Sequence, residues 1–297
     1  MMQVSTKLFY DRSTSAMSLL SVRADTLQTQ IATGKRLATA SDDAVAFTRL
    51  SGIARANADA DVSLANLDVA ASVLAQADAT LGTIGSQLTR ARELTIQARG
   101  VLDDTARQAI AAELDAIVAQ LVTLGNSTDP RGQPLFGGGG GEAAVTPDGA
   151  GGYTFAATLP SAIPTSDGQS VQPGETAARL FARTGGDTLS DIATLATALR
   201  TNTGVDAAAV ATGDALAGGA TQVLTVRTSL GARAQRVEVE QAMLQQTGID
   251  REAVRSGLED TDITAAITEL QKTMTILSAT QASFTKLQGL SLFEYLR

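Results

Sequence analysis

The sequence from residue 53 to residue 98, IARANADADVSLANLDVAASVLAQADATLGTIGSQLTRARELTIQA, decides the fold. Its apolar residues recur every seven positions and no proline interrupts it. A stripe held for about six heptads is typical of a long helix packed along other long helices. At about 1.5 Å per residue, this helix would be roughly 70 Å long. The predicted seam is Ile53, Ala60, Leu67, Leu74, Leu81, Leu88 and Thr95, joined in the later half by Ala77, Ile84 and Ala91.

Three polar residues, Asn57, Asp78 and Arg92, interrupt this stripe. Polar side chains at buried coiled-coil positions fix the register of the helices and add little stability. We therefore expect these three residues to specify how the long helix pairs with its partners.

The two ends of the chain are also predicted to be amphipathic helices. The first covers residues 5–34, and the last begins after residue 262. Both carry apolar residues at helical spacing, and the C-terminal tail stays apolar to its end. The predicted contact residues are Met17, Leu20, Ala24, Leu27 and Ile31 in the first helix, Ile263, Ile267, Leu270, Met274, Leu277, Gln281 and Phe284 in the last, and Leu292 and Phe293 in the tail.

Polar breaks at residues 39–43 and 257–262 join these end helices to the middle of the chain. Gly34 ends the first helix, and Ser41 or Asp42 is expected to cap the next one. Residues 259–262, Glu-Asp-Thr-Asp, are expected to cap the last helix. A capping turn explains the pair Asp42–Asp43 better than a metal site, since no further ligands accompany it.

The remaining helices follow from the same kind of pattern. Asp103 or Asp104 caps a third helix that ends at residues 125–126, and helices resume at 188–201 and from about residue 206. Gly248 is expected to interrupt the latter. Between them, residues 130–185 contain all six prolines, a run of glycines and short alternating stretches such as 153–158, which indicate a small β-rich insertion.

The sequence thus predicts a mainly α protein: a long antiparallel coiled-coil or helical bundle formed by the N- and C-terminal regions, with a small β-rich central insertion. Three domains are expected. Residues 1–44 with 258–297 form a terminal amphipathic coiled coil, residues 45–129 with 186–257 form a long-helix bundle, and residues 130–185 form an outer insertion.

Composition excludes several functions. The 297 residues carry a net charge of −8, which disfavours nucleic acid as a partner. There is no cysteine and no histidine, so zinc–thiolate sites, thiolate nucleophiles and histidine bases are impossible, and no metal or other cofactor is expected. Carboxylate chemistry at Asp42–Asp43 or Asp103–Asp104 is the remaining enzymatic alternative. The N-terminus lacks the pattern of a cleaved signal peptide, and no apolar run suggests membrane insertion.

The amphipathic ends suggest self-assembly. An isolated short helix is marginal in water, so the two ends should gain order by pairing with each other or with other subunits. Burial of each large side chain would contribute about 1.5–3 kcal/mol. The alternative is that these seams pack only within one chain.

Several short motifs resemble the flagellin family. Residues 33–44, with Gly34, Lys35, Arg36, Ser41, Asp42 and Asp43, are similar to its N-terminal signature, although Val45 and Ala46 depart from it. Residues 229–233, with Leu230, Gly231 and Arg233, are similar to a motif of its C-terminal region. Within the family, three stretches resemble the hook–filament junction (FlgL-type) proteins: residues 133–138, residues 259–262 with Glu259, Asp260 and Asp262, and residues 291–296.

The resemblance implies a non-enzymatic structural component of the bacterial flagellum that assembles with itself into a tube connecting hook and filament. It implies other hook-associated proteins and flagellin as neighbours, a type III export chaperone on the C-terminal helix, and export to the flagellum without a cleaved signal peptide. Two alternatives remain: a filament flagellin, or a surface module that binds glycans through Tyr153, Phe155 and Phe181 of the insertion.

Overall fold

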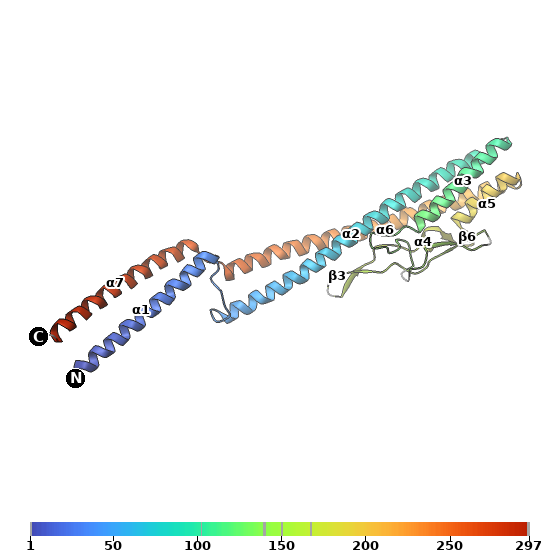
Figure 1. Ribbon diagram of the computed structural model, residues 1–297. Helices are drawn as coiled ribbons and strands as arrows, with labels where there is room; N and C mark the ends of the chain where they lie inside the picture. Colours follow the sequence, from blue (N-terminus) through green and yellow to red (C-terminus); the bar gives the residue numbers. More distant parts are fainter. Residues whose placement is uncertain (1, 102, 139–140, 150, 167, 296–297) are drawn as a thin grey trace. The chain divides into compact units, whose positions relative to one another are not determined.

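The computed structural model describes residues 2–101, 103–138, 141–149, 151–166 and 168–295, except for the side chains of residues 2–6, 166 and 287–295 (Figure 1). It confirms a mainly helical chain with short strands in the central insertion. In chain order the described elements are α1 (Met2–Thr33), α2 (Ala44–Ala98), α3 (Asp104–Gly125), β1 (Val145–Pro147), β2 (Tyr153–Phe155), β3 (Ile163–Ser166), β4 (Gln169–Val171), α4 (Ala177–Phe181), β5 (Ala182–Arg183), β6 (Gly186–Asp187), α5 (Thr188–Thr201), α6 (Val205–Glu259) and α7 (Ile263–Tyr295).

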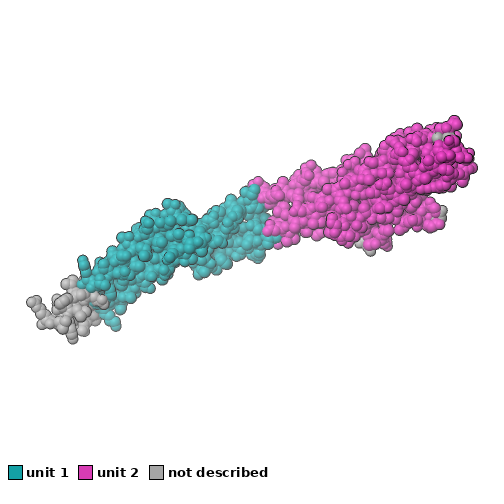
Figure 2. Space-filling model, turned by 45° about the horizontal axis from the view of Figure 1, so that its top comes forward, with its two compact units in different colours: residues 1–58, 247–297 teal, residues 59–246 magenta. Residues whose placement is uncertain are grey.

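The chain divides into two compact units, residues 1–58 with 247–297 and residues 59–246 (Figure 2). We call them the terminal unit and the central unit. The predicted insertion, residues 130–185, lies within the central unit. The finer division into three domains stays a prediction.

The central unit encloses a continuous apolar core. The predicted stripe of α2 supplies one wall of this core, because Leu67, Leu74 and Leu81 are at most 1% exposed. The predicted change of seam is confirmed as well, since Ile84 and Ala91 are fully buried. An ideal helix rotates by about 20° per heptad against a strict seven-residue repeat, which explains why the seam moves.

This rotation also corrects one prediction. Arg92 is exposed and does not interrupt the seam, because the neighbouring Ala91 has taken the buried position. Asp78 lies at the edge of the seam, where both of its carboxylate oxygens accept hydrogen bonds from Arg227 of α6 at 2.8 and 3.0 Å. Gln241 of α6 likewise donates to Asp68 of α2. These pairs fix the antiparallel register of α2 and α6.

Helix α3 packs alongside α5 and closes the core. Of the two candidate caps, Asp103 is the actual one, since its side chain accepts a hydrogen bond from the Ala106 N–H at 2.7 Å. The helix ends at Gly125 as predicted, and no larger residue fits at this position, since a Cβ would lie 2.7 Å from Val145. Among the described helices, α3 alone is long and apolar enough to cross a membrane, but its buried Leu114 and Leu121 mark it as a core helix.

The insertion consists of three antiparallel strand pairs, β1–β2, β3–β4 and β5–β6, and the short helix α4, which the sequence did not predict. Val145 stands opposite Phe155 in the first pair, and Phe155 lies against Phe181 with ring centroids 5.8 Å apart. Phe181 is fully buried. The aromatic residues therefore form a small core under the strands.

The terminal unit is built differently. Helices α1 and α7 pack antiparallel along each other, and Tyr10 meets Phe284 edge-to-face with ring centroids 5.3 Å apart (Figure 1). The described residues of this unit include few buried apolar side chains. They are Ala24, Leu27, Leu37, Ala46 and Ala266.

The predicted interruption of the helix at Gly248 is wrong, because α6 continues to Glu259. A single glycine costs a helix about 1 kcal/mol relative to alanine, which is too little to end a helix that is otherwise well formed.

Candidate functional site

The connections on either side of the long helices meet in the terminal unit. Residues 34–43 connect α1 to α2 and residues 260–262 connect α6 to α7. We call these two segments, together with Glu259 at the end of α6, the joint. Lys35 and Asp260 form an isolated antiparallel β-bridge, and the Arg36 N–H donates to the carbonyl of Glu259 at 2.6 Å. Residues just before the predicted hinge at 39–43 therefore pair through their backbones with the predicted hinge at 257–262.

Gly34 makes this pairing possible. Its φ of +70° is a left-handed conformation that side chains other than glycine's rarely adopt. The turn exposes the Gly34 carbonyl to the Thr261 N–H, which donates to it at 2.9 Å. Arg36 adds a side-chain bond, since its guanidinium donates to the carbonyl of Leu258 at 2.9 Å. Several hydrogen bonds thus hold the connection between α1 and α2 against the end of α6 and the connection that follows it.

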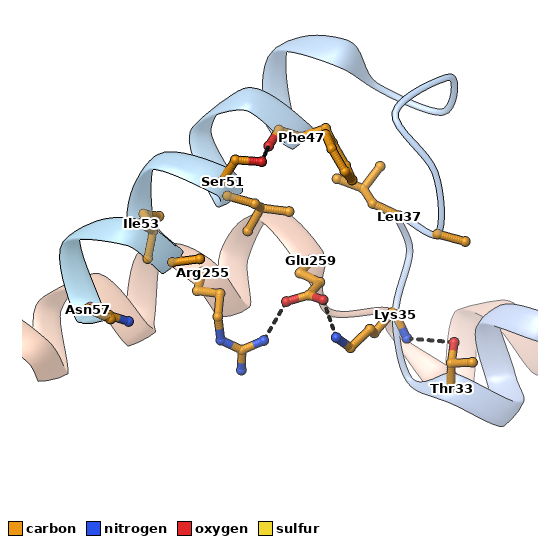
Figure 3. Close-up of a pocket in the computed structure, with 12 residues that line it drawn as sticks. Thr33, Lys35, Leu37, Phe47, Ser51, Ile53, Asn57, Arg255 and Glu259 are labelled. Carbon is orange, nitrogen blue, oxygen red and sulfur yellow. Dashed lines mark hydrogen bonds and ion pairs between the residues drawn. The ribbon is translucent and has the colours of Figure 1, made fainter. Parts of the chain in front are cut away.

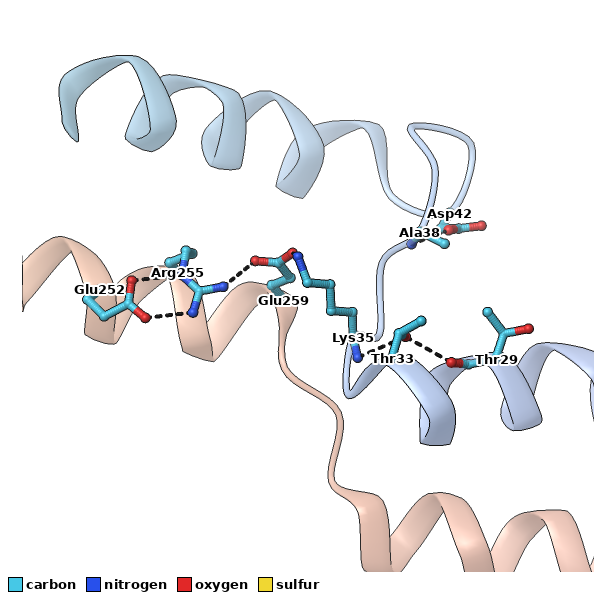
Figure 4. Close-up of polar contacts among 8 residues, drawn as sticks. All are labelled: Thr29, Thr33, Lys35, Ala38, Asp42, Glu252, Arg255 and Glu259. Atoms are coloured by element: carbon cyan, nitrogen blue, oxygen red, sulfur yellow. Dashed lines mark hydrogen bonds and ion pairs between the residues drawn. The ribbon is translucent and has the colours of Figure 1, made fainter. Parts of the chain in front are cut away.

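A chain of charges crosses the joint (Figure 4). The Glu259 carboxylate pairs with Lys35 and, at 2.5 Å, with Arg255, which also pairs with Glu252 at 2.6 Å. The hydrogen bonds from Lys35 and then Arg255 hold the pKa of Glu259 below its ordinary value, and those from Arg255 do the same for Glu252. Sequence reasoning missed Arg255, although its spacing of four residues from Glu259 was a usable signal.

The double aspartate forms a capping turn, but not with the predicted residues. Asp43, rather than Ser41 or Asp42, caps α2: its carboxylate accepts hydrogen bonds from the N–H groups of Val45 and Ala46 at 3.1 and 2.9 Å. The Asp42 carboxylate turns back and accepts from the Thr39 and Ala38 N–H groups, which lower the pKa of Asp42.

The remaining polar residues of the joint fix the connection itself. Ser41 bonds the hydroxyl of Thr39 at 2.7 Å. Asp262 caps α7 by accepting from the Ala265 N–H at 3.0 Å, and Asp260 accepts from the hydroxyl of Ser256 at 2.5 Å. The expectation of a capping segment before the last helix is confirmed.

A pocket of about 620 Å³ opens beside the joint within the terminal unit (Figure 3). Its apolar wall comes from the connection and the first turns of α2, and Arg255 and Glu259 contribute the opposite side. Sequence reasoning did not find this pocket, because its residues come from three segments that only the fold brings together. The apolar lining includes Leu37, Phe47, Leu50 and Ile53.

The predicted assembly residues divide into two groups. One group packs α1 against α7 within the chain: Leu27 is buried, and Met17, Leu20, Ile31, Leu270, Leu277 and Phe284 are half-buried. The other group faces outward, since Ile263, Ile267 and Met274 are 48%, 41% and 49% exposed. Within the chain, the packed face of α7 is centred on Ala266 and Thr273 and lies to one side of the predicted seam, whose role in assembly stays a prediction. Leu292 and Phe293 lie outside the residues whose side chains are described.

The motif Leu230–Gly231–Arg233 lies on α6 in the central unit. Leu230 is a core residue, and a Cβ on Gly231 would meet nothing within 4 Å. Arg233 fastens the insertion to α6: its guanidinium donates to the carbonyls of Gln172 and Gly174 at 3.1 and 3.0 Å. Arg233 also pairs at 2.5 Å with Glu175, whose side chain is 3% exposed.

The structure does not support the other proposed sites. Phe181 is buried and Tyr153 and Phe155 are half-buried against the core, so they do not form an open platform for a sugar ring. Asp103 and Asp43 act as helix caps, as described above. Among the described residues, no group of three or more acidic side chains is placed to hold a metal ion.

Comparison with known proteins gives consistent matches along the chain. Residues 4–140 match the bacterial flagellin N-terminal helical region, and residues 214–296 match the bacterial flagellin C-terminal helical region. The flagellar hook-associated protein 3 of Salmonella typhimurium is 26% identical over 315 aligned residues, which cover 99% of each chain.

Two solved structures share the fold. A Vibrio parahaemolyticus protein assigned to the flagellar hook-associated proteins is 20% identical, with a TM-score of 0.69 over 74% of this chain and 100% of its own. The flagellar junction protein FlgL of Legionella pneumophila is 14% identical, with a TM-score of 0.55 over 73% of this chain and 100% of its own.

Proposed function

Because the chain belongs to the flagellin family and carries both of its helical regions, we propose that it is a hook-associated protein of the bacterial flagellum. In this role it would connect hook and filament at their junction. The relatives that match along their whole length are flagellar hook-associated proteins, and one structural neighbour is a flagellar junction protein. The role is structural rather than enzymatic.

The exposed apolar surface of the terminal unit is the observation that carries this proposal. Five apolar side chains are buried among its described residues, whereas twelve large apolar side chains are exposed. Such surface is unfavourable in water, and its burial against other copies would stabilise an assembly. The exposed residues are Leu8, Phe9, Leu19, Val22, Val45, Phe47, Ile249, Val254, Ile263, Ile267, Met274 and Ile276.

Deletion of residues 1–40 and 260–297 tests the proposal. The remaining chain keeps the whole core of the central unit, so it should stay folded by circular dichroism. Full-length protein should sediment as multimers in a concentration-dependent manner, and the truncated protein should remain monomeric. If the full-length chain associates no more than the truncated one, the terminal helices serve folding alone.

The finer partners belong to the same proposal. We expect copies of the chain to form a tubular layer that contacts other hook-associated proteins on one side and flagellin on the other. Before export, a chaperone would cover α7, whose exposed Ile263, Ile267 and Met274 need protection in the cell. Export through the flagellar type III route would leave the N-terminus uncut, so the intact mass of the secreted protein should equal that of the cellular protein.

Filament flagellin is the second candidate, because the same two family regions would also match a filament subunit. Immunogold labelling of isolated flagella separates the two candidates. Label confined to the hook end of the filament supports the junction assignment, whereas label along the whole filament contradicts it.

A further inference from the structure

The pocket beside the joint is suited to bind an uncharged side chain. Its volume of about 620 Å³ is many times the roughly 30 Å³ that one water molecule occupies in the liquid. Its charged lining residues are already paired, since Glu259 binds both Lys35 and Arg255. Because these charges satisfy each other, the pocket attracts apolar rather than ionic groups.

A matching surface lies on α7 of the same unit. Ile263, Ile267 and Met274 are spaced by four and seven residues, which places them along one face of the helix. All three are more than 40% exposed in the chain. This face, which we call the α7 stripe, therefore does not fill the chain's own pocket.

Exposed apolar residues on α1 fit the pocket less well. Leu19 and Val22 are 72% and 60% exposed, but the exposed acids Asp11 and Asp25 lie on the same side of the helix. If that face of α1 entered the pocket, the two carboxylates would lose water. The charges of the pocket are already paired and would not compensate for this loss, so binding would cost free energy. The α7 stripe has no charged residue among its own three positions.

We propose that the α7 stripe of one copy seats in the pocket beside the joint of a second copy, an inference that rests on the proposed assembly function. The stripe and the pocket are different surfaces, so copies can add head to tail, and we place the contact in this heterologous arrangement rather than in a two-fold dimer in which each stripe fills the other copy's pocket. A heterologous contact leaves a free pocket on one partner and a free stripe on the other, so further copies can join. Such contacts build rings, helices and tubes, whereas a self-complementary contact stops at a dimer.

Cysteine pairs test this contact directly, because the native chain contains no cysteine. One full-length variant carries Ala54→Cys, at an exposed lining residue of the pocket, and a second carries Ile267→Cys on the stripe. The matched control replaces Ile267→Cys with Ala265→Cys, which is exposed on the other side of α7. The two variants are mixed, allowed to assemble and oxidised, and the disulfide-linked dimer is measured on a non-reducing gel.

The stripe pair should cross-link at least about tenfold faster than the control pair, because the contact raises the local concentration of the two thiols. If wild-type protein assembles but both pairs cross-link at the same rate, the inference is wrong and the proposed function stands. If wild-type protein does not assemble at all, the proposed function and the inference fail together.

Filling the pocket provides a second measurement. Ala54→Phe should place a ring in the pocket and abolish the multimers, while circular dichroism and the unfolding midpoint stay those of the wild type. Ala65→Phe is the control, since Ala65 is exposed on the same helix and does not line the pocket. Normal assembly of the Ala54→Phe protein would overturn the proposal.

Discussion

The terminal and central units use the same kind of heptad stripe but bury it to different extents. In the central unit, Leu81 of α2 and Leu114 of α3 are fully buried, because four helices and the insertion cover one another. In the terminal unit, α1 and α7 bury one face each, and three of the six buried side chains described in this unit are alanines. The number of packed layers therefore decides whether a stripe makes a core or an exposed surface.

The largest expected effect is a core substitution in the central unit. Leu81→Ala should lower the free energy of unfolding by about 2–5 kcal/mol, because it removes a fully buried side chain and leaves a cavity. Leu20→Ala in the terminal unit should cost less than half as much, since that side chain is only half-buried. Urea unfolding of dilute monomer measures both values, and equal losses would contradict the contrast between the units.

The sequence predicted the parts of this contrast that depend on periodicity. The spacing of Leu67, Leu74 and Leu81 placed the core of α2 correctly, and even the drift to Ile84 and Ala91 was visible. Periodicity cannot say how many partners cover a stripe, so the exposure of Ile267 and Met274 was not predicted. Their positions relative to Ala266 and Thr273 depend on how α7 is rotated against α1.

Contacts between segments that are far apart along the chain also could not be predicted from the sequence. Gly34 was expected to end the first helix and Glu259 to lie in the second hinge, and nothing local indicates that the backbones of these two segments pair. Arg233 was noted as part of a motif, but its bonds to Gly174 and Glu175 depend on the path of the insertion. Caps were predicted to within one or two residues, since Asp42 and Asp43 have equal propensities and only the turn geometry separates them.

The second largest effect concerns Arg233. Arg233→Ala removes one partner of the buried Glu175 and two hydrogen bonds to the insertion. Breaking a buried pair costs about 3–5 kcal/mol, and the loss here should be about 2–3 kcal/mol because Arg179 still binds Glu175. The central unit should therefore unfold at a lower urea concentration, and the pairing of α1 with α7 should not change.

Arg236→Ala is the matched control for this substitution. Arg236 is exposed and donates to Gln169 at 3.3 Å, so its loss should change the unfolding free energy by less than about 0.5 kcal/mol. If both variants lose the same stability, Arg233 does not hold the insertion in the way that its contacts indicate.

The smallest expected effect is the response of the joint to acid. The pKa of Glu259 is lowered in the folded chain, chiefly by Lys35, from an ordinary value of 4.5. The carboxylate therefore contributes stability that is fully present above about pH 4.5 and is lost as the pH falls through the lowered value. Because Lys35 is half-exposed, this contribution should be at most about 1 kcal/mol.

Amide hydrogen exchange, corrected for intrinsic rates, follows this response at the Arg36 and Thr261 N–H groups that close the joint. Their protection should fall on acidification before that of Leu81 in the central core, because the joint is closed next to the ionised Glu259, whereas the Leu81 amide exchanges only when the apolar core opens. Glu259→Gln should lower the protection at pH 7 and flatten its pH dependence, since the titrating group is gone. An unchanged acid response in the Glu259→Gln protein would assign the effect to another carboxylate, first to Asp42, whose pKa is lowered by the Thr39 and Ala38 N–H groups of the same connection.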